Sequence, residues 1–203
     1  DNVSYKQAAM MEPMAVAVHA MRRFYIEKDS SVCVIGLGTI GLLLTMFLKA
    51  EGIQNVYVEG NKDMQKHFAQ KLGVDDEHYN VDNVVADYVF ECVGKNETIN
   101  RAIELAAPAG NIVLVGNPYS EMNIPKDTYW KILRKQLKLS GTWNSSYAGE
   151  SGDDWHYVLN MLADGRIDPE QFITHEYPLD AIQKGMEIMR DKSEDYVKVM
   201  CIS

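Results

Sequence analysis

Basic residues, cysteines and long apolar runs are all scarce in this sequence of 203 residues. Its 20 lysines and arginines are outnumbered by 29 aspartates and glutamates, which gives a formal net charge of −9 at pH 7. Because non-specific nucleic-acid binding needs a basic surface, this balance argues against a nucleic-acid partner. No run approaches about eighteen consecutive apolar residues, so no membrane-spanning segment is predicted. The chain opens abruptly at Asp1 without a signal-like stretch, as a fragment or a processed product would.

Only three cysteines are present, Cys33, Cys92 and Cys201, and each lies in an apolar, strand-like run. None is spaced as Cys-x-x-Cys, so neither a metal knuckle nor a redox pair is indicated. We interpret all three as buried free thiols, which is typical of a protein of the reducing cytoplasm.

What the sequence does contain is a regular alternation of strand and helix patterns. The predicted strands are Val32–Ile35, Val56–Glu59, Tyr88–Cys92, Asn111–Val115 and Leu137–Trp143. The predicted helices between them are Ile40–Ala50, Asp63–Leu72, Glu97–Ala107 and Thr128–Arg134. Strands joined by single helices imply right-handed crossovers, and their nearly uniform apolar character suits a sheet covered on both faces. The predicted fold class is therefore α/β, a doubly wound parallel sheet of the Rossmann type.

A glycine-rich turn follows the first strand, in the run Gly36-Leu37-Gly38-Thr39-Ile40-Gly41. In this Gly-x-Gly-x-x-Gly pattern, Gly36 allows a tight turn, Gly38 lets the backbone approach a pyrophosphate, and Gly41 lets helix pack on strand. The phosphates would lie at the positive end of the following helix. A structural glycine turn is the alternative, but strand before and helix after favour a dinucleotide site.

The end of the second strand bears on which dinucleotide is bound. An acidic residue there usually binds the adenosine ribose hydroxyls of NAD. If Glu59 points to the ribose, NAD is expected. If Gly60 occupies that place, room opens for the 2′-phosphate of NADP, with Asn61 as donor and Lys62 as counter-charge. Both cofactors stay open, with NADP slightly favoured, and Glu59 and Lys62 could instead be ordinary solvated residues.

Two further strand ends fall where ligands of open α/β sheets bind, outside the carboxyl ends of the strands. They are Cys92-Val93-Gly94 and Val115-Gly116-Asn117, which we predict as cofactor contacts. Each glycine could equally belong to a turn that starts a helix.

The regions on either side of the sheet have a different pattern. A helix is predicted within 12–25, where His19 lies on the apolar side and is interpreted as a core or packing residue. After the turn-rich segment 145–152, the chain becomes more polar. Its predicted elements are helices at 153–164 and 179–191 and strands at Ile173–Tyr177 and Val197–Ile202. We expect three parts, namely a linker helix in 1–25, a dinucleotide-binding domain in 26–148, and a returning C-terminal segment in 149–203.

Four motifs occur in an order that resembles a known family. They are Met11-Glu-Pro-Met-Ala-Val-Ala-Val-His-Ala20, Val-Ile-Gly-Leu-Gly-Thr-Ile-Gly, Asp-Tyr-Val-Phe-Glu-Cys-Val-Gly and Lys131-Ile-Leu-Arg-Lys-Gln-Leu-Lys-Leu-Ser-Gly-Thr-Trp-Asn144. From about residue 8 onward the chain is similar to zinc-dependent medium-chain dehydrogenases, especially the sorbitol and galactitol-1-phosphate types. The resemblance implies hydride transfer between NAD or NADP and a polyol or polyol phosphate, such as galactitol 1-phosphate.

The resemblance also implies roles for particular residues. Glu12 matches a glutamate that lies at the catalytic zinc, although by itself it could be a helix N-terminal carboxylate favoured by the dipole. Most zinc ligands would lie in an N-terminal domain outside this sequence, since one carboxylate cannot hold zinc alone. Thr142, Trp143 and Asn144 match a strand end that approaches nicotinamide and substrate. By composition alone, Trp143 could instead be a core residue.

Two departures from the family pattern stand out. Gly60 replaces the aspartate of most NAD-dependent members. The connection Val74–Asp87 is about a dozen residues shorter than in the family, so the crossover helix expected there has no counterpart, and it is barely long enough for a parallel crossover.

The resemblance further implies a homo-oligomer, a dimer or a tetramer. It would form through an edge strand at Asn111–Val115 or through the neighbouring segment around Pro118–Asn123. A cofactor-binding module without catalysis, with a sensing or assembly role, is the alternative function. A short-chain dehydrogenase is disfavoured, because no Tyr-x-x-x-Lys pair is present.

Overall fold

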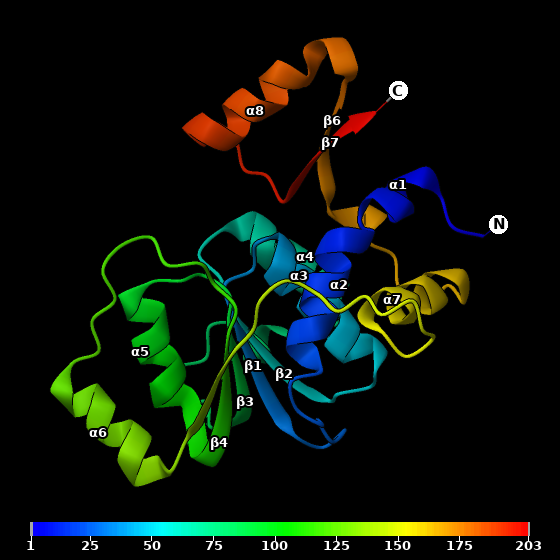
Figure 1. Cartoon of the computed structure of the whole chain (residues 1–203). Helices are drawn as coiled ribbons and strands as arrows, with labels where there is room; N and C mark the ends of the chain where they lie inside the picture. The colour runs from blue at the N-terminus through cyan, green and yellow to red at the C-terminus, as the bar shows by residue number, and fades with distance from the viewer. Residues whose placement is uncertain (1, 203) are drawn as a thin grey trace.

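The computed structural model describes residues 2–202, and five parallel strands form its central sheet (Figure 1). The strands are β1 (Ser31–Ile35), β2 (Asn55–Glu59), β3 (Ala86–Glu91), β4 (Ala106–Leu114) and β5 (Lys138–Gly141). Their order across the sheet is β2-β1-β3-β4-β5, and every neighbouring pair is parallel. The predicted doubly wound α/β fold is confirmed.

Helices cover both faces of the sheet, which explains why its inner strands are mostly apolar. One core contains Val32 and Val34 of β1 and is covered by α2 (Met11–Met21), α3 (Thr39–Ala50), α4 (Asp63–Lys71) and α7 (Asp154–Ala163). The other contains Cys33 and Ile35 and is covered by α5 (Asn96–Leu105) and α6 (Lys126–Lys135). Alternate residues of one strand therefore enter two different cores, so no polar face remains.

The edges of the sheet differ from those expected. β4 pairs with both β3 and β5, so the prediction that Asn111–Val115 is an edge strand was wrong. The edge strands are β2 and β5. β5 is shorter than predicted, and three of its four residues are exposed. The segment around Pro118–Asn123 is exposed and has no regular structure.

The short connection from α4 to β3 contains a single 3-10 turn, Asp76–His78, and no further helix. Beyond it, Tyr79 forms one parallel bridge with Val58, and the Asn80 N–H donates to the Val58 carbonyl at 2.9 Å. The Asn80 amide continues this pairing, since it accepts from the Gly60 N–H and donates to the Gly60 carbonyl, both at 2.9 Å. The backbone and side chain of Asn80 therefore supply hydrogen-bond partners for part of the outer edge of β2, with which a further strand would otherwise pair.

The C-terminal elements form a second, smaller sheet (Figure 1). β6 (Ile173–Pro178) and β7 (Lys198–Ile202) are parallel, and α8 (Ile182–Asp191) packs on them. The 3-10 turn Glu170–Phe172 precedes β6, and the 3-10 turn Leu179–Ala181 joins β6 to α8. The helix α1 (Tyr5–Ala9), which periodicity did not predict, lies beside this sheet, and Lys6 pairs with Glu176 at 2.6 Å. The three-part division of the chain stays a prediction.

Two predictions from composition can be compared with the structure. None of the helices within residues 2–202 is both long and apolar enough to cross a membrane. Cys33 is buried, as predicted, whereas Cys92 is half-buried and Cys201 is exposed, so the prediction of three buried thiols was wrong. Burial, and then the nearby Glu59 carboxylate, raise the pKa of Cys33 far above its usual value, which keeps this thiol neutral.

Candidate functional site

The glycine turn after β1 has the backbone geometry that the sequence predicts. Gly36 has φ +94°, a conformation that side chains disfavour, and its N–H donates to the Glu59 carbonyl at 2.9 Å. A Cβ on Gly41 would lie 1.9 Å from the Gly36 carbonyl oxygen, so the helix can approach the turn only with glycine there. A Cβ on Gly38 would meet no atom within 4 Å, so space remains beside the turn.

The turn leads directly into α3, whose first N–H groups have no intrahelical acceptor. Its N-cap is Gly38, and no side chain caps it. The positive end of the helix dipole therefore faces the free space beside Gly38, which is the arrangement that binds phosphate groups. The Thr39 hydroxyl is directed elsewhere, because it donates to the Val197 carbonyl at 2.5 Å.

A hollow of about 440 Å³ lies beside this turn. Eight predicted cofactor residues line it, namely Gly36, Leu37, Gly38, Glu59, Gly60, Asn61, Cys92 and Val93. Five other polar or aromatic residues of the wall were not predicted, namely Gln65, Asn80, Lys95, Thr98 and Tyr119. Lys95 and Thr98 come one and four residues after Gly94, so the predicted cofactor contact there could have been extended to them. No local pattern marks Asn80.

The loops after β3 and β4 form the next part of the wall and contact each other closely. A Cβ on Gly94 would lie 1.9 Å from the Asn117 carbonyl oxygen, and one on Gly116 would lie 2.1 Å from the Gly94 nitrogen. The fully buried Glu91 holds both loops. Its Oε1 accepts from the Val93 and Gly94 N–H groups at 2.8 Å, and its carbonyl accepts from Val115 and Gly116. These glycines are therefore required by close packing of two loops.

Two further hollows continue the groove toward α2. The first, of about 400 Å³, shares Cys92, Val93 and Tyr119 with the hollow at the glycine turn. The second, of about 290 Å³, shares Ile40, Val115 and Asn117 with the first, and Glu12, Thr142, Trp143 and Asn144 complete its wall. The groove therefore runs from Gly60 to Glu12 along the carboxyl ends of the strands, where open α/β sheets bind ligands.

Within this last hollow the predicted residues have distinct environments. Trp143 is 79% exposed, which excludes the alternative that it is a core residue. Asn144 adopts a left-handed conformation with φ 59°, so the chain turns sharply after β5. The Thr142 hydroxyl oxygen is buried and has no hydrogen-bond partner within residues 2–202.

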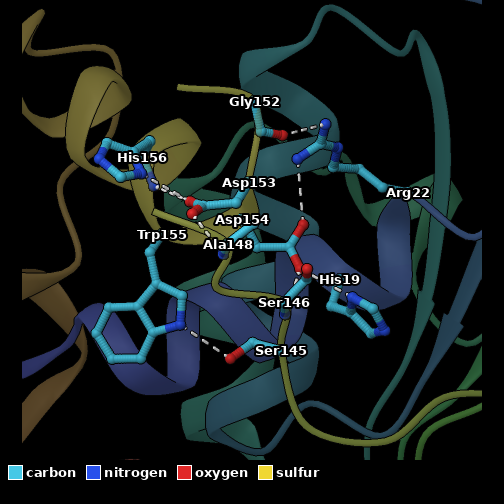
Figure 2. A network of polar contacts seen from close by, with 10 residues as sticks. All are labelled: His19, Arg22, Ser145, Ser146, Ala148, Gly152, Asp153, Asp154, Trp155 and His156. Atoms are coloured by element: carbon cyan, nitrogen blue, oxygen red, sulfur yellow. Dashed lines mark hydrogen bonds and ion pairs between the residues drawn. The ribbon is translucent and has the colours of Figure 1, made fainter. Parts of the chain in front are cut away.

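A polar network fixes the segment that follows Asn144 against α2 (Figure 2). The buried Asp154 accepts from the Ser146 N–H at 2.8 Å and from the Arg22 guanidinium at 3.1 Å. The His19 ring nitrogen lies 2.8 Å from the same carboxylate, so His19 is a partly buried pairing residue and not the predicted core residue. Because α2 also carries Glu12, this network sets the spacing between two walls of the groove.

Asp153 caps the N-terminus of α7 in the same network (Figure 2). Burial opposes its charge. Hydrogen bonds from the His156 N–H and ring and from the Ala148 N–H outweigh this burial and hold the pKa of Asp153 well below its usual value. The carboxylate is therefore ionised near neutral pH.

Four predicted cofactor residues do not line the groove, each for a separate reason. Thr39 contacts Val197, Gly41 packs on the turn, and Gly94 packs on Asn117. The Lys62 Nζ lies 2.6 Å from Asp195 Oδ1 in an ion pair. Their role as direct cofactor contacts stays a prediction.

Glu12 is exposed in the first turn of α2 and lines the groove, but residues 2–202 do not complete a metal site around it. In the part of the chain that the structure describes, one group of His, Cys, Asp or Glu side chains has ligand spacing. It is Asp75, Glu77 and His78, which does not include Glu12. The described residues around Glu12 therefore do not complete a zinc site.

Comparison with known proteins identifies the family. The family described as glucose dehydrogenase C-terminus matches residues 6–201, nearly the whole chain. The chain belongs to this family. The resemblance to zinc-dependent medium-chain dehydrogenases that the four motifs indicate is thereby confirmed.

As a member of the glucose dehydrogenase C-terminal family, the chain is similar to several polyol dehydrogenases. It is 29% identical to the L-idonate 5-dehydrogenase of Vitis vinifera, over 92% of this chain and 52% of the relative. It is 26% identical to the galactitol 1-phosphate 5-dehydrogenase of Escherichia coli K12, over 84% of this chain and 53% of the relative. The chain thus spans about half the length of these curated relatives.

Solved structures share the fold over the whole chain. Galactitol-1-phosphate dehydrogenase from Escherichia coli has a TM-score of 0.85 at 22% identity, covering 99% of this chain and 61% of that one. A zinc-binding dehydrogenase from Sinorhizobium meliloti 1021 bound to NADP has a TM-score of 0.81 at 22% identity, covering 99% and 61%. A short chain alcohol dehydrogenase from Escherichia coli CFT073 complexed with NADH has a TM-score of 0.84 at 22% identity, covering 99% and 60%.

Proposed function

We propose that this chain is the dinucleotide-binding part of a polyol dehydrogenase that transfers hydride between NAD or NADP and a polyol or polyol phosphate. One observation carries the proposal. The open space at Gly38 and the uncapped N-terminus of α3 lie at one side of a groove that continues to Glu12 and Trp143. Such a groove is suited to an extended dinucleotide with its pyrophosphate on the helix N-terminus.

The residues of this chain have separate tasks in this proposal. The Gly36–Gly41 turn binds the pyrophosphate, and the Gly94 and Gly116 loops form the wall that orients the nicotinamide ring. A bound nicotinamide supplies the hydride acceptor or donor. Thr142, Trp143 and Asn144 lie beside Glu12 and would direct the reacting face of the ring toward the substrate.

Glu12 is proposed as one ligand of the catalytic zinc, with the remaining ligands outside residues 2–202. The described residues do not complete that site, so no step of the reaction is assigned to the metal. The polyol substrate class, including galactitol 1-phosphate, rests on the similarity to L-idonate 5-dehydrogenase and galactitol 1-phosphate 5-dehydrogenase. A homo-oligomer is proposed from the same resemblance, and a cytoplasmic location from the free cysteines.

Titration of the 203-residue chain with NADH and with NADPH tests the proposal. Trp143 is exposed in the groove, so binding of the reduced nicotinamide should quench its fluorescence. The Trp143→Phe variant should lose this quenching. Trp130→Phe, which removes an exposed tryptophan of α6, should keep it.

The same chain should not oxidise galactitol 1-phosphate in the presence of NAD or NADP and zinc, because Glu12 is the one ligand of the catalytic zinc that we propose among the described residues. Zinc-dependent turnover by residues 1–203 alone would contradict the assignment of the other ligands. Failure to bind either nucleotide would overturn the proposed function.

A further inference from the structure

The carboxylate at the end of β2 is bound to an arginine of another helix. Arg101 on α5 donates from Nε to Glu59 Oε1 at 2.8 Å, and its second guanidinium nitrogen lies 2.7 Å from the same oxygen. The two side chains are only 28% and 17% exposed. Tyr57, two residues earlier, packs against the core beneath α5. Side chains alternate along a strand, so Glu59 faces α5 as Tyr57 does.

Arg101 is itself fixed by its surroundings. The Nη2 group that lies against Glu59 also donates to the Val81 carbonyl at 3.1 Å, and Nη1 donates to the Asp82 carbonyl at 3.4 Å, in the short connection before β3. The hydrogen bond with Glu59 raises the pKa of Arg101 above its usual value, so the guanidinium keeps its charge. The ion pair therefore neutralises Glu59 and holds it on the α5 side of the strand end.

The next residue, Gly60, leaves no room for a carboxylate of its own. A Cβ at Gly60 would lie 2.6 Å from the Tyr79 hydroxyl and 2.8 Å from Gln65 Oε1. Gln65 accepts from the Asn61 N–H at 2.9 Å, and the Asn80 amide is bound to the Gly60 backbone. Burial, and then Asp63, raise the pKa of Tyr79, so its hydroxyl is neutral. Apart from Glu59, this end of the hollow presents neutral amides, the hydroxyls of Thr98 and Tyr119, and the exposed ammonium group of Lys95.

We infer that Arg101 is a positioning residue for cofactor choice, which holds and neutralises Glu59 so that the groove prefers a 2′-phosphorylated nicotinamide dinucleotide. A ribose diol gains affinity from a free carboxylate that accepts its two hydroxyls, whereas a 2′-phosphate is repelled by one. With Glu59 paired, the attraction for the diol and the repulsion of the phosphate are both reduced. This inference rests on the proposed dinucleotide site.

Dissociation constants of NADPH and NADH for the 203-residue chain, from nucleotide fluorescence titration, test the inference. Wild-type protein should bind NADPH more tightly than NADH. Arg101→Gln releases the Glu59 charge and should weaken NADPH by about tenfold relative to NADH, because an unpaired carboxylate repels the phosphate. Arg134→Gln, on the exposed side of α6 where the guanidinium stacks on Trp130, should leave the ratio unchanged.

Two further variants separate charge from folding. Glu59→Gln keeps the carbonyl contacts of Arg101 and should raise the preference for NADPH or leave it at the wild-type value. The Glu59→Gln, Arg101→Gln double variant removes both charges and should restore a ratio close to wild type. An unchanged ratio in Arg101→Gln, or a wild-type preference for NADH, would overturn the inference. Absence of binding of either nucleotide would instead overturn the proposed function.

Discussion

Asp154 at the start of α7 and Arg22 just after α2 form an ion pair of 3.1 Å, although more than half of the chain separates them. Asp154 is nearly fully buried, and it also accepts from Ser146 and contacts His19 (Figure 2). This carboxylate therefore joins the helix that carries Glu12 to the segment that follows Trp143. The geometry of the groove at its α2 end depends on it.

Replacement of Asp154 by alanine should destabilise the fold. It leaves the Ser146 N–H and the His19 ring without their acceptor. Arg22 is partly exposed, so water can solvate its charge and the loss of stability is limited. We expect a decrease of about 2 to 3 kcal/mol in the free energy of unfolding, measured by urea denaturation. Asp180→Ala, at an exposed position, is the control and should change stability little. Equal stability of the two variants would show that the network is not important.

Substitutions of two glycines in the turn should affect different properties, the stability of the fold at Gly41 and the binding of the cofactor at Gly38. Gly41→Ala places a Cβ 1.9 Å from a backbone oxygen and should cost about 1 to 3 kcal/mol of stability. Gly38→Ala meets no atom within 4 Å and should unfold at the wild-type urea concentration. It should nevertheless weaken NADPH binding about tenfold, because the new methyl group occupies the space of the pyrophosphate.

Gly152→Ala also meets no atom within 4 Å, and it lies outside the groove lining, so it should alter neither stability nor binding. If Gly38→Ala binds NADPH as tightly as Gly152→Ala does, then the turn does not contact the pyrophosphate.

Glu91 should be essential for the loops after β3 and β4. Glu91→Ala leaves the Val93 and Gly94 N–H groups without an acceptor, and we expect a loss of about 2 to 4 kcal/mol in the free energy of unfolding. Glu91→Gln keeps one acceptor oxygen and should lose less of the free energy of unfolding. Thermal unfolding monitored by circular dichroism compares the two variants. A glutamine variant less stable than the alanine variant would contradict this role.

The stability of the protein should fall in acid partly through Asp153. The pKa of Asp153 is depressed in the folded protein relative to about 3.9 in an unfolded chain, so folding favours the ionised form. Its contribution is complete above about pH 5 and is lost as the pH falls through the folded pKa. Asp153→Asn should therefore flatten the decrease in unfolding free energy below about pH 5, measured by urea denaturation at several pH values.

The control for this pH dependence is Asp164→Asn, at the exposed C-terminal end of α7. This variant should keep the wild-type slope. If Asp153→Asn keeps it too, then Asp153 does not contribute to acid sensitivity.

Much of the fold follows from local patterns. The apolar runs of β1 and β3 and the periodicity of α3 gave elements whose ends differ by one or two residues from those observed. The five-residue α1 was missed because it is shorter than two turns, and only the Ser4 and Gln7 capping box marks it. The edge position was assigned to β4 wrongly, because strand order depends on which strands pair and not on any one strand.

The candidate site was predictable to a similar extent. Most residues predicted at strand ends line one groove, because parallel strands bring their carboxyl ends to the same side of the sheet. Whether Glu59 points to the ribose stayed open in the sequence, because only the packing of Tyr57 beneath α5 shows which side of β2 Glu59 faces. Its partner could not be predicted either, since Arg101 lies on a helix beyond the next strand.

The sequence alone determined the alternation of strands and helices, the glycine turn and the family motifs, because these reflect backbone sterics and the burial of consecutive residues. Only the tertiary structure decided that Arg101 neutralises Glu59, that Asp195 engages Lys62, and that Glu12 and Trp143 share one hollow. Such contacts join residues far apart in the chain. They depend on how close two packed elements bring their side chains, which no local pattern records.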